Sequence, residues 1–237
     1  MIKVSIFNEF LHEKIDDTVR ALYPDGIHGQ LRKALESDEI TVRTFTLDTV
    51  NDLTKEALDD TDVLLWWGHV GHHLVPDEVA ARVRDAVQGG MGAIFLHSAH
   101  HSKPFKLLMG TSGNLAWRES GDKARVWNLS PAHPIAQGIG RYFLEDKEET
   151  YCEPFDIPTP DDLVFATWYE GGELMRTGCC WNRGRGKVFY FQPGHETYPV
   201  YYNEDVLRVI KNAVYWAQPV QRIDIGYCPC VSPANDD

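Results

Sequence analysis

Four histidines occupy positions in the sequence from which imidazole could do chemistry near neutral pH. His69, His97 and His195 follow apolar runs that resemble buried strands, and His28 lies at the start of the first long predicted helix. Neutral imidazole is the commonest metal-ligating side chain and the usual general base. If these strand ends share one edge, the four histidines are candidate ligands for a divalent metal, with zinc favoured for a three-histidine site.

Carboxylate and hydroxyl groups are expected at the same edge. Glu9 follows the first predicted strand, Ser98 follows the fourth, and either Glu149 or Glu9 is a candidate for moving a proton. Ser98 and His195 could instead form a nucleophile–base pair, with Glu9 or Glu149 as the third member. The glycines that usually flank a serine nucleophile are missing, since the local sequence is Leu-His-Ser-Ala-His.

Aromatic side chains near these strand ends are candidates for sugar binding. Trp66 and Trp67 are consecutive, so in a strand their side chains point to opposite faces, and Trp67 is the candidate platform. Tyr151 and Tyr198 are the other candidate substrate-binding residues.

The other histidines have no strand-end spacing in their favour. They are expected in solvated, capping or outer positions: His12, His72, His73, His100, His101 and His133. Of these, His100 and His101 are expected to begin the helix that follows the fourth strand.

The elements that must position these residues alternate through the first half of the chain. The predicted strands are 2–7, 40–47, 62–67 and 93–96, and the predicted helices are 26–37 and 76–88. The second helix begins with Pro76 and ends before Gly89, as helix termini favour. Apolar strands separated by helices indicate an α/β fold with a mostly parallel sheet covered on both faces. Ligands bind at the carboxyl edge of such sheets.

The second half of the chain is richer in strands. The predicted strands are 125–129, 141–151, 163–169, 175–182 and 187–192, and the predicted final helix is 203–218. The last two strands flank an Arg-Gly-Arg-Gly turn and form a hairpin. No linker or repeat divides the chain, so we expect a single domain over 1–218 followed by a tail over 219–237.

Composition excludes several classes of protein. The chain has 237 residues, of which 43% are apolar, and a net charge of −12, which disfavours a nucleic-acid partner. No window approaches the ~18 apolar residues of a membrane span, and the start of the chain is not a signal peptide. No glycine-rich phosphate loop is present, so a nucleotide cofactor is not expected.

Five cysteines without paired C-x-x-C spacing indicate a reduced, cytoplasmic protein, and the tail that holds Cys228 and Cys230 suggests a homo-oligomer contact.

Six motifs in order resemble the trehalose-utilisation ThuA-like family over about residues 2–216. They are YPDGIHG, LLWWGHV, AIFLHSA, HPIAQGI, EETY and GRGKVFYFQPGHE. The resemblance implies a flavodoxin-like three-layer sandwich of the class I glutamine amidotransferase superfamily. It also implies a link to trehalose-like disaccharides and to sugar oxidoreductases that make their 3-keto derivatives.

The resemblance also argues against glutaminase activity. The superfamily places a cysteine nucleophile where this chain has His97-Ser98, and a His-x-Glu pair where His195 is followed directly by Glu196. Glutamine hydrolysis is therefore not expected. The family pattern of an acidic residue two positions before a tyrosine matches Glu149 and Tyr151.

Three functions follow from these observations. The first is a metal-assisted enzyme that isomerises, eliminates or hydrolyses a 3-keto sugar. The second is a sugar-binding or accessory partner of a sugar oxidoreductase, without chemistry of its own. The third is a metal-free hydrolase that uses Ser98.

Overall fold

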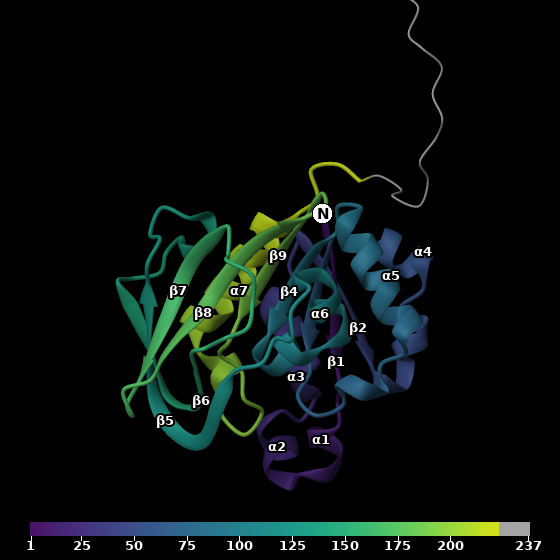
Figure 1. The fold of residues 1–237 in the computed structure, drawn as a ribbon. Helices are drawn as coiled ribbons and strands as arrows, with labels where there is room; N and C mark the ends of the chain where they lie inside the picture. Colours follow the sequence, from purple (N-terminus) through teal and green to yellow (C-terminus); the bar gives the residue numbers. More distant parts are fainter. Residues whose placement is uncertain (223–237) are drawn as a thin grey trace, which may run out of the picture.

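The structure is a computed structural model and describes residues 1–222 (Figure 1). Its strands are β1 (Ile2–Asn8), β2 (Ile40–Thr46), β3 (Val63–Trp67), β4 (Gly92–Leu96), β5 (Ala116–Asn128), β6 (Tyr142–Cys152), β7 (Asp162–Tyr169), β8 (Leu174–Arg183) and β9 (Gly186–Phe191). Its helices are α1 (His12–Ile15), α2 (Asp17–Leu22), α3 (Gly26–Leu35), α4 (Lys55–Asp59), α5 (Asp77–Gln88), α6 (Lys103–Met109) and α7 (Glu204–Ala217). The tail from residue 223, with Cys228 and Cys230, lies outside the described residues.

One nine-stranded sheet runs through the molecule in the order β2-β1-β3-β4-β9-β8-β7-β5-β6. The first five strands pair in parallel, whereas every pairing from β9 to β6 is antiparallel. The sheet is therefore mixed, and the expectation of a mostly parallel sheet holds only for its first half. The reason lies in the connections, because parallel neighbours need long crossovers, whereas β8 turns directly into β9 within a tight hairpin.

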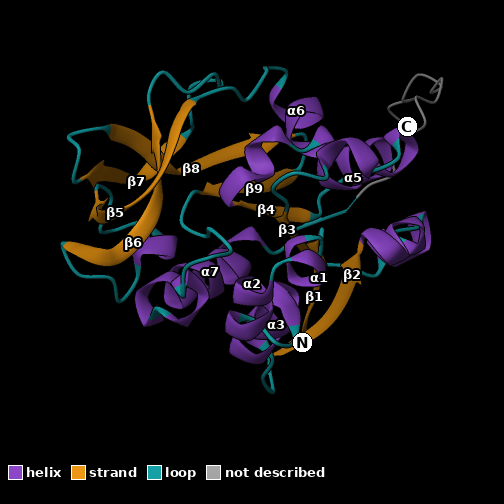
Figure 2. Cartoon of the chain, turned by 90° about the horizontal axis from the view of Figure 1, so that it is seen from below, coloured by secondary structure: helices purple, strands orange, loops and turns teal. Residues whose placement is uncertain are grey.

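The parallel half is covered on both faces (Figure 2). All five residues of β3 are buried, and alternate side chains enter different cores. Leu65 belongs to the core that contains Leu31 of α3 and Ile210 of α7. Leu64, on the other face, belongs to the core that contains Val83 of α5. This arrangement explains why these strands are continuous apolar runs.

The antiparallel half bends back toward the carboxyl edge of the parallel half. Gln192 Nε2, just after β9, donates to the carbonyl oxygen of Glu149 in β6 over 3.3 Å. The Tyr169 hydroxyl in β7 donates to Gln192 Oε1 over 2.7 Å. The last strand of the sheet thus contributes side chains to the edge where β3, β4 and β9 end.

The predicted long helices are confirmed to within two residues at each end. The sequence pattern missed the short helices α1, α2 and α4, and it began β5 nine residues too late. The helix expected after β4 is present as α6, but it begins at Lys103, after His100 and His101. The first part of β5 is largely exposed and carries no alternation of apolar and polar residues. None of the helices within residues 1–222 is long and apolar enough to cross a bilayer.

Candidate functional site

Three of the four predicted histidines meet where neighbouring parallel strands end. His69 follows β3, His97 follows β4 and His195 follows β9, and these strands are adjacent in the sheet. The centroid of the His97 ring is 5.6 Å from that of His69 and 5.4 Å from that of His195. The rings of His69 and His195 are also 5.4 Å apart. The three imidazoles therefore form a nearly equilateral triangle.

The backbone and a carbonyl group together fix the orientation of His97. His97 is fully buried and has a φ of 53°, in the left-handed region that costs a non-glycine residue about 1–3 kcal/mol. Its Nδ1 lies 3.1 Å from the carbonyl oxygen of Gln192. When Nδ1–H donates to that oxygen, the lone pair of Nε2 faces the other histidines.

A tight loop after β9 presents His195. Gly194 has a φ of 152°, and a Cβ at that position would lie 2.2 Å from the Tyr201 hydroxyl oxygen. The indole N–H of Trp67 donates to the Gly194 carbonyl oxygen over 3.1 Å, which ties the loop to β3. On the ring itself, Nδ1 of His195 lies 2.8 Å from Thr197 Oγ1, so Nε2 points into the cluster.

Glu149 of β6 completes the group. Its Oε2 lies 3.1 Å from His97 Nε2 and 3.9 Å from His195 Nε2. One ligand atom from each of His69, His97, Glu149 and His195 lies within 4.8 Å of all the others. This Oε2 is buried, and within residues 1–222 its short contact is the ion pair with His97. Three imidazoles can hold a zinc ion and leave its fourth position open, so the cluster could bind a cation with the Glu149 carboxylate beside it.

Electrostatics couples two of these side chains. Burial alone would lower the pKa of His97, but the neighbouring Glu149 carboxylate outweighs burial and raises it. Burial would raise the pKa of Glu149, but the hydrogen bond and charge of His97 outweigh burial and lower this pKa. Burial and the charge of His97 lower the pKa of His195 to about 4, so its lone pair is free at neutral pH. A cation would replace the proton that the His97–Glu149 pair otherwise holds.

A second group of donors lies beside the first and shares His69 with it. Ligand atoms of His12, His69 and Glu196 lie within 4.8 Å of one another. Glu196 Oε1 is 3.1 Å from His69 Nδ1 and 3.4 Å from His12 Nδ1. Burial would raise the pKa of Glu196, but the hydrogen bond from His69 outweighs it and lowers the pKa to about 2. Glu196 is therefore placed to orient the His69 ring from outside.

Two predicted site residues lie away from the cluster. His28 is not among the grouped ligand atoms, because its Nδ1 lies 3.0 Å from the Asn8 side-chain nitrogen and burial lowers its pKa. Glu9 Oε2 accepts hydrogen bonds from the backbone N–H groups of Val70 and Gly71, over 2.9 and 2.8 Å. Glu9 thus holds the loop that follows His69 and does not reach the triangle.

Ser98 and Tyr151 form a pair behind His97. The Ser98 hydroxyl hydrogen-bonds the Tyr151 hydroxyl, and no imidazole is bonded to it. The Tyr151 ring stacks on His97 with centroids 5.2 Å apart and is buried, so it packs against the histidine. Tyr198 remains partly exposed, with its ring 5.2 Å from that of His195, at the solvent side of the cluster.

Two expectations about exposure need correction. Trp67 is fully buried, with its indole N–H bound to a backbone carbonyl, so it supports the loop after β9 and has no free face for a sugar. His100 is buried and not solvated, because its Nδ1 donates to the Gly113 carbonyl oxygen over 2.7 Å. Each of these side chains binds a backbone carbonyl of another segment, which local sequence patterns do not reveal.

Sequence reasoning missed three acidic residues around the site. Glu148 accepts hydrogen bonds from the backbone N–H groups of Gly194 and His195, over 2.9 and 3.2 Å. Glu196 supports His69, and Glu119 Oε1 lies 3.9 Å from His195 Nε2. The only signal was the acidic run around Glu148, which a solvated surface strand explains equally well.

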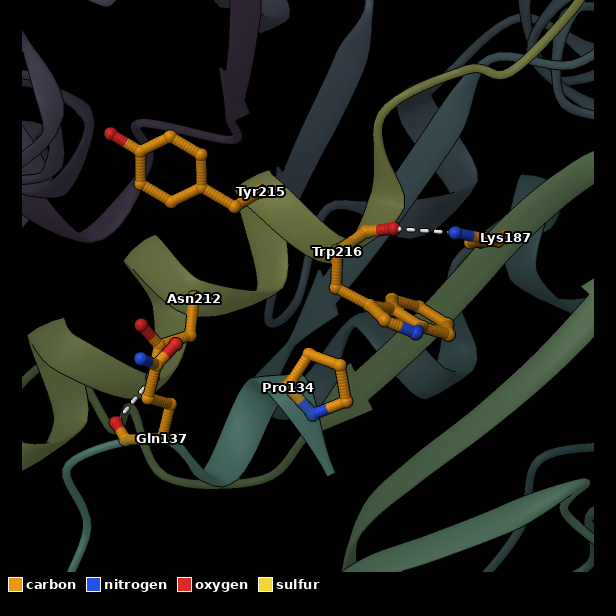
Figure 3. A pocket seen from close by; sticks show the side chains of 6 residues that line it. All are labelled: Pro134, Gln137, Lys187, Asn212, Tyr215 and Trp216. Carbon is orange, nitrogen blue, oxygen red and sulfur yellow. Dashed lines mark hydrogen bonds between the residues drawn. The ribbon is translucent and has the colours of Figure 1, made fainter. Parts of the chain in front are cut away.

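A separate cavity of about 350 Å³ opens near the amino end of β9 (Figure 3). Two of its polar side chains are already paired. Lys187 Nζ donates to the Trp216 carbonyl oxygen over 2.8 Å. Asn212 Nδ2 donates to the Gln137 carbonyl oxygen over 2.8 Å. Because the hydrogen bonds are internal, this cavity is a weaker candidate than the histidine triangle.

The fold and site define an α/β protein with one mixed sheet and a histidine-rich site at its carboxyl edge. A family model described as ThuA, trehalose utilisation, matches residues 3–217, and the chain belongs to this family. None of the curated proteins compared with the chain matches it.

Solved structures share the fold at low sequence identity. A ThuA-like protein from Parabacteroides merdae superposes with a TM-score of 0.68 at 14% identity, covering 94% of this chain and 92% of the other. A ThuA-like protein from Bacteroides uniformis gives 0.64 at 13% identity, covering 91% and 90%. A cytoplasmic protein from Salmonella typhimurium gives 0.58 at 12% identity, covering 92% and 100%. These likenesses concern the fold alone.

Proposed function

We propose that the protein is a metal-assisted enzyme that acts on a trehalose-like disaccharide or its 3-keto derivative. The observation that carries the proposal is the grouping of three imidazoles with the buried Glu149 carboxylate, whose ligand atoms all lie within 4.8 Å of one another. Membership of a trehalose-utilisation family supports the substrate class. A sugar oxidoreductase would supply the 3-keto substrate.

The residues divide into ligands and a base. His69, His97 and His195 would hold a divalent cation, most suitably zinc, and leave one position open for a sugar oxygen. The cation would polarise a carbonyl or hydroxyl group of the sugar. Glu149 would take the proton from the carbon beside the carbonyl, because its pKa is lowered and it is unprotonated at neutral pH.

Metal analysis of untagged protein tests the proposal. We expect about one divalent ion per chain by mass spectrometry of the elements, as for a single catalytic zinc site. His69→Ala, a change at a partly exposed position, should lower the affinity for the ion. The loss should exceed the roughly 10–100-fold that changes outside the ligand shell cause. His28→Ala should keep it. A metal-free protein that converts 3-keto-trehalose at the full rate would contradict the proposal, as would equal metal loss in both variants.

The two alternatives have less support. A sugar-binding role without chemistry depended on exposed aromatic platforms, and Trp67 and Tyr151 are both buried. A serine hydrolase needs a base on Ser98, whose hydroxyl is hydrogen-bonded to Tyr151. No observation in the described residues favours either of them over the metal-assisted enzyme.

A further inference from the structure

The ladder between β5 and β6 is interrupted beside the histidine triangle. Arg118 pairs with Thr150, and the next pair is Asp122 with Glu148, so β5 has two more residues than β6 over this interval. Gly121 has a φ of 65°, which favours glycine at this turn of the chain. The intervening residues 119–121 form a bulge, and bulges redirect side chains next to sites.

Side-chain contacts hold both ends of this bulge. The Arg118 guanidinium forms ion pairs with Asp122 at the other end of the bulge and with Glu173 in the turn between β7 and β8. Asp122 also accepts a hydrogen bond from the Thr150 hydroxyl over 2.9 Å. The segment is therefore tied at both ends, while Glu119 and Ser120 between them are exposed.

The bulge lies over the loop that presents His195. A Cβ on Gly121 would lie 2.9 Å from the Tyr198 hydroxyl oxygen, so the bulge and that loop are in contact. Three carboxylate oxygens lie 3.9 Å from His195 Nε2: Glu119 Oε1, Glu149 Oε2 and Glu196 Oε1. They differ in burial, because the Glu119 side chain is 58% exposed, whereas those of Glu149 and Glu196 are 4% and 3% exposed.

We propose that Glu119 is the ligand-facing carboxylate of the site and makes it select neutral polyhydroxyl ligands over anionic ones. Carboxylates beside one imidazole take different roles when their environments differ, and Glu119 is the exposed one of the three. The buried Glu149 faces the cluster, while Glu119 stays at the solvent side, where it can accept hydrogen bonds from sugar hydroxyls. Its negative charge repels acids that approach the cation. This inference rests on the proposed cation at His69, His97 and His195.

Binding of acetate to the cobalt-loaded protein tests the role of Glu119. Co²⁺ replaces zinc at such sites and reports bound anions through its visible absorption. We expect Glu119→Gln to bind acetate at least about fivefold more tightly than the wild type at low salt, because one nearby negative charge is gone. Glu119→Asp should stay within twofold of the wild type.

The matched control is Glu170→Gln, which removes one exposed carboxylate from the turn after β7. Its acetate affinity should stay within about twofold of the wild type, because distant exposed charges are screened. Equal acetate affinities for Glu119→Gln and the wild type would overturn the inference while leaving the cation proposal intact. Loss of cobalt from Glu119→Gln would overturn it as well, since Glu119 would then be a ligand. A wild type that takes up no Co²⁺ would contradict the proposed function itself, and the inference with it.

Discussion

At the scale of single residues, Glu148 fixes the position of the loop that carries His195. Its two carboxylate oxygens accept hydrogen bonds from three backbone N–H groups, those of Glu149, Gly194 and His195. Burial raises its pKa to about 7, although the charge of His97 and the backbone hydrogen bonds oppose the rise. One side chain thus joins β6 to the loop that carries His195.

Replacing Glu148 by Gln should destabilise the protein and weaken metal binding. The amide has only one acceptor oxygen, so its NH₂ group would face backbone N–H donors. We expect a loss of about 2–4 kcal/mol in urea unfolding, since buried donors lose their acceptor. Glu170→Gln should change stability by less than about 0.5 kcal/mol. Unchanged stability in Glu148→Gln would show that this bridge is dispensable.

The sequence predicted which residues converge only where their position depends on the order of the strands. His69, His97 and His195 come together because adjacent parallel strands end at one edge. His28 and Glu9 satisfy the same logic but face other partners, Asn8 and the loop after His69. Which partner a polar side chain chooses depends on contacts across distant segments, which a single sequence does not encode in any local pattern.

At the scale of elements, the loop after β9 is shaped by crowding as well as by backbone conformation. A Cβ on Gly194 would lie 2.2 Å from the Tyr201 hydroxyl oxygen and 3.2 Å from the Cβ of His97. Both neighbours are fully buried and cannot move aside cheaply. Glycine is required here because the loop passes between the two side chains that flank the site.

Gly194→Ala should therefore cost about 2–4 kcal/mol of stability, because strain and overpacking act together. Gly110→Ala is the matched control, since Gly110 has a φ of 71° but a methyl group added there would meet no atom within 4 Å. That variant should lose only about 1 kcal/mol. The comparison can be made by thermal unfolding. Equal losses would mean that backbone conformation alone, and not crowding, selects Gly194.

At the scale of the whole molecule, the predicted and observed folds differ mainly in the second half. The parallel half was predictable because buried strands and their covering helices carry strong apolar patterns. The antiparallel half was predicted strand by strand, but its curvature was not. That curvature brings Glu148 and Glu149 to the carboxyl edge of the parallel half. It depends on contacts between distant segments, such as the hydrogen bond from Tyr169 to Gln192.

The curvature also buries acidic groups, and this should make stability depend on pH. Burial, reinforced by the charge of Glu148, raises the pKa of Glu145 to about 9. The folded state therefore favours protonated Glu145, and its contribution to stability falls as pH rises from about 4.5 toward 9. We expect Glu145→Gln to gain roughly 4 kcal/mol relative to the wild type between pH 5 and pH 8.

Urea unfolding at the two pH values measures this difference. Glu170→Gln is the matched control, because it makes the same change at an exposed carboxylate in the turn after β7. That variant should show no change in relative stability between the two pH values. A pH-independent effect of Glu145→Gln would contradict the assignment of a raised pKa.

The bend that carries β6 back to β9 also has a consequence for the order of events in folding. His69 and Glu149 belong to opposite halves of the sheet, and the site is complete only after the two halves have docked. Contacts between such distant segments form late, and interactions absent from the transition state slow unfolding without speeding folding. A cation bound between the two halves would therefore slow unfolding and lengthen the lifetime of the native state. It would leave the folding rate almost unchanged.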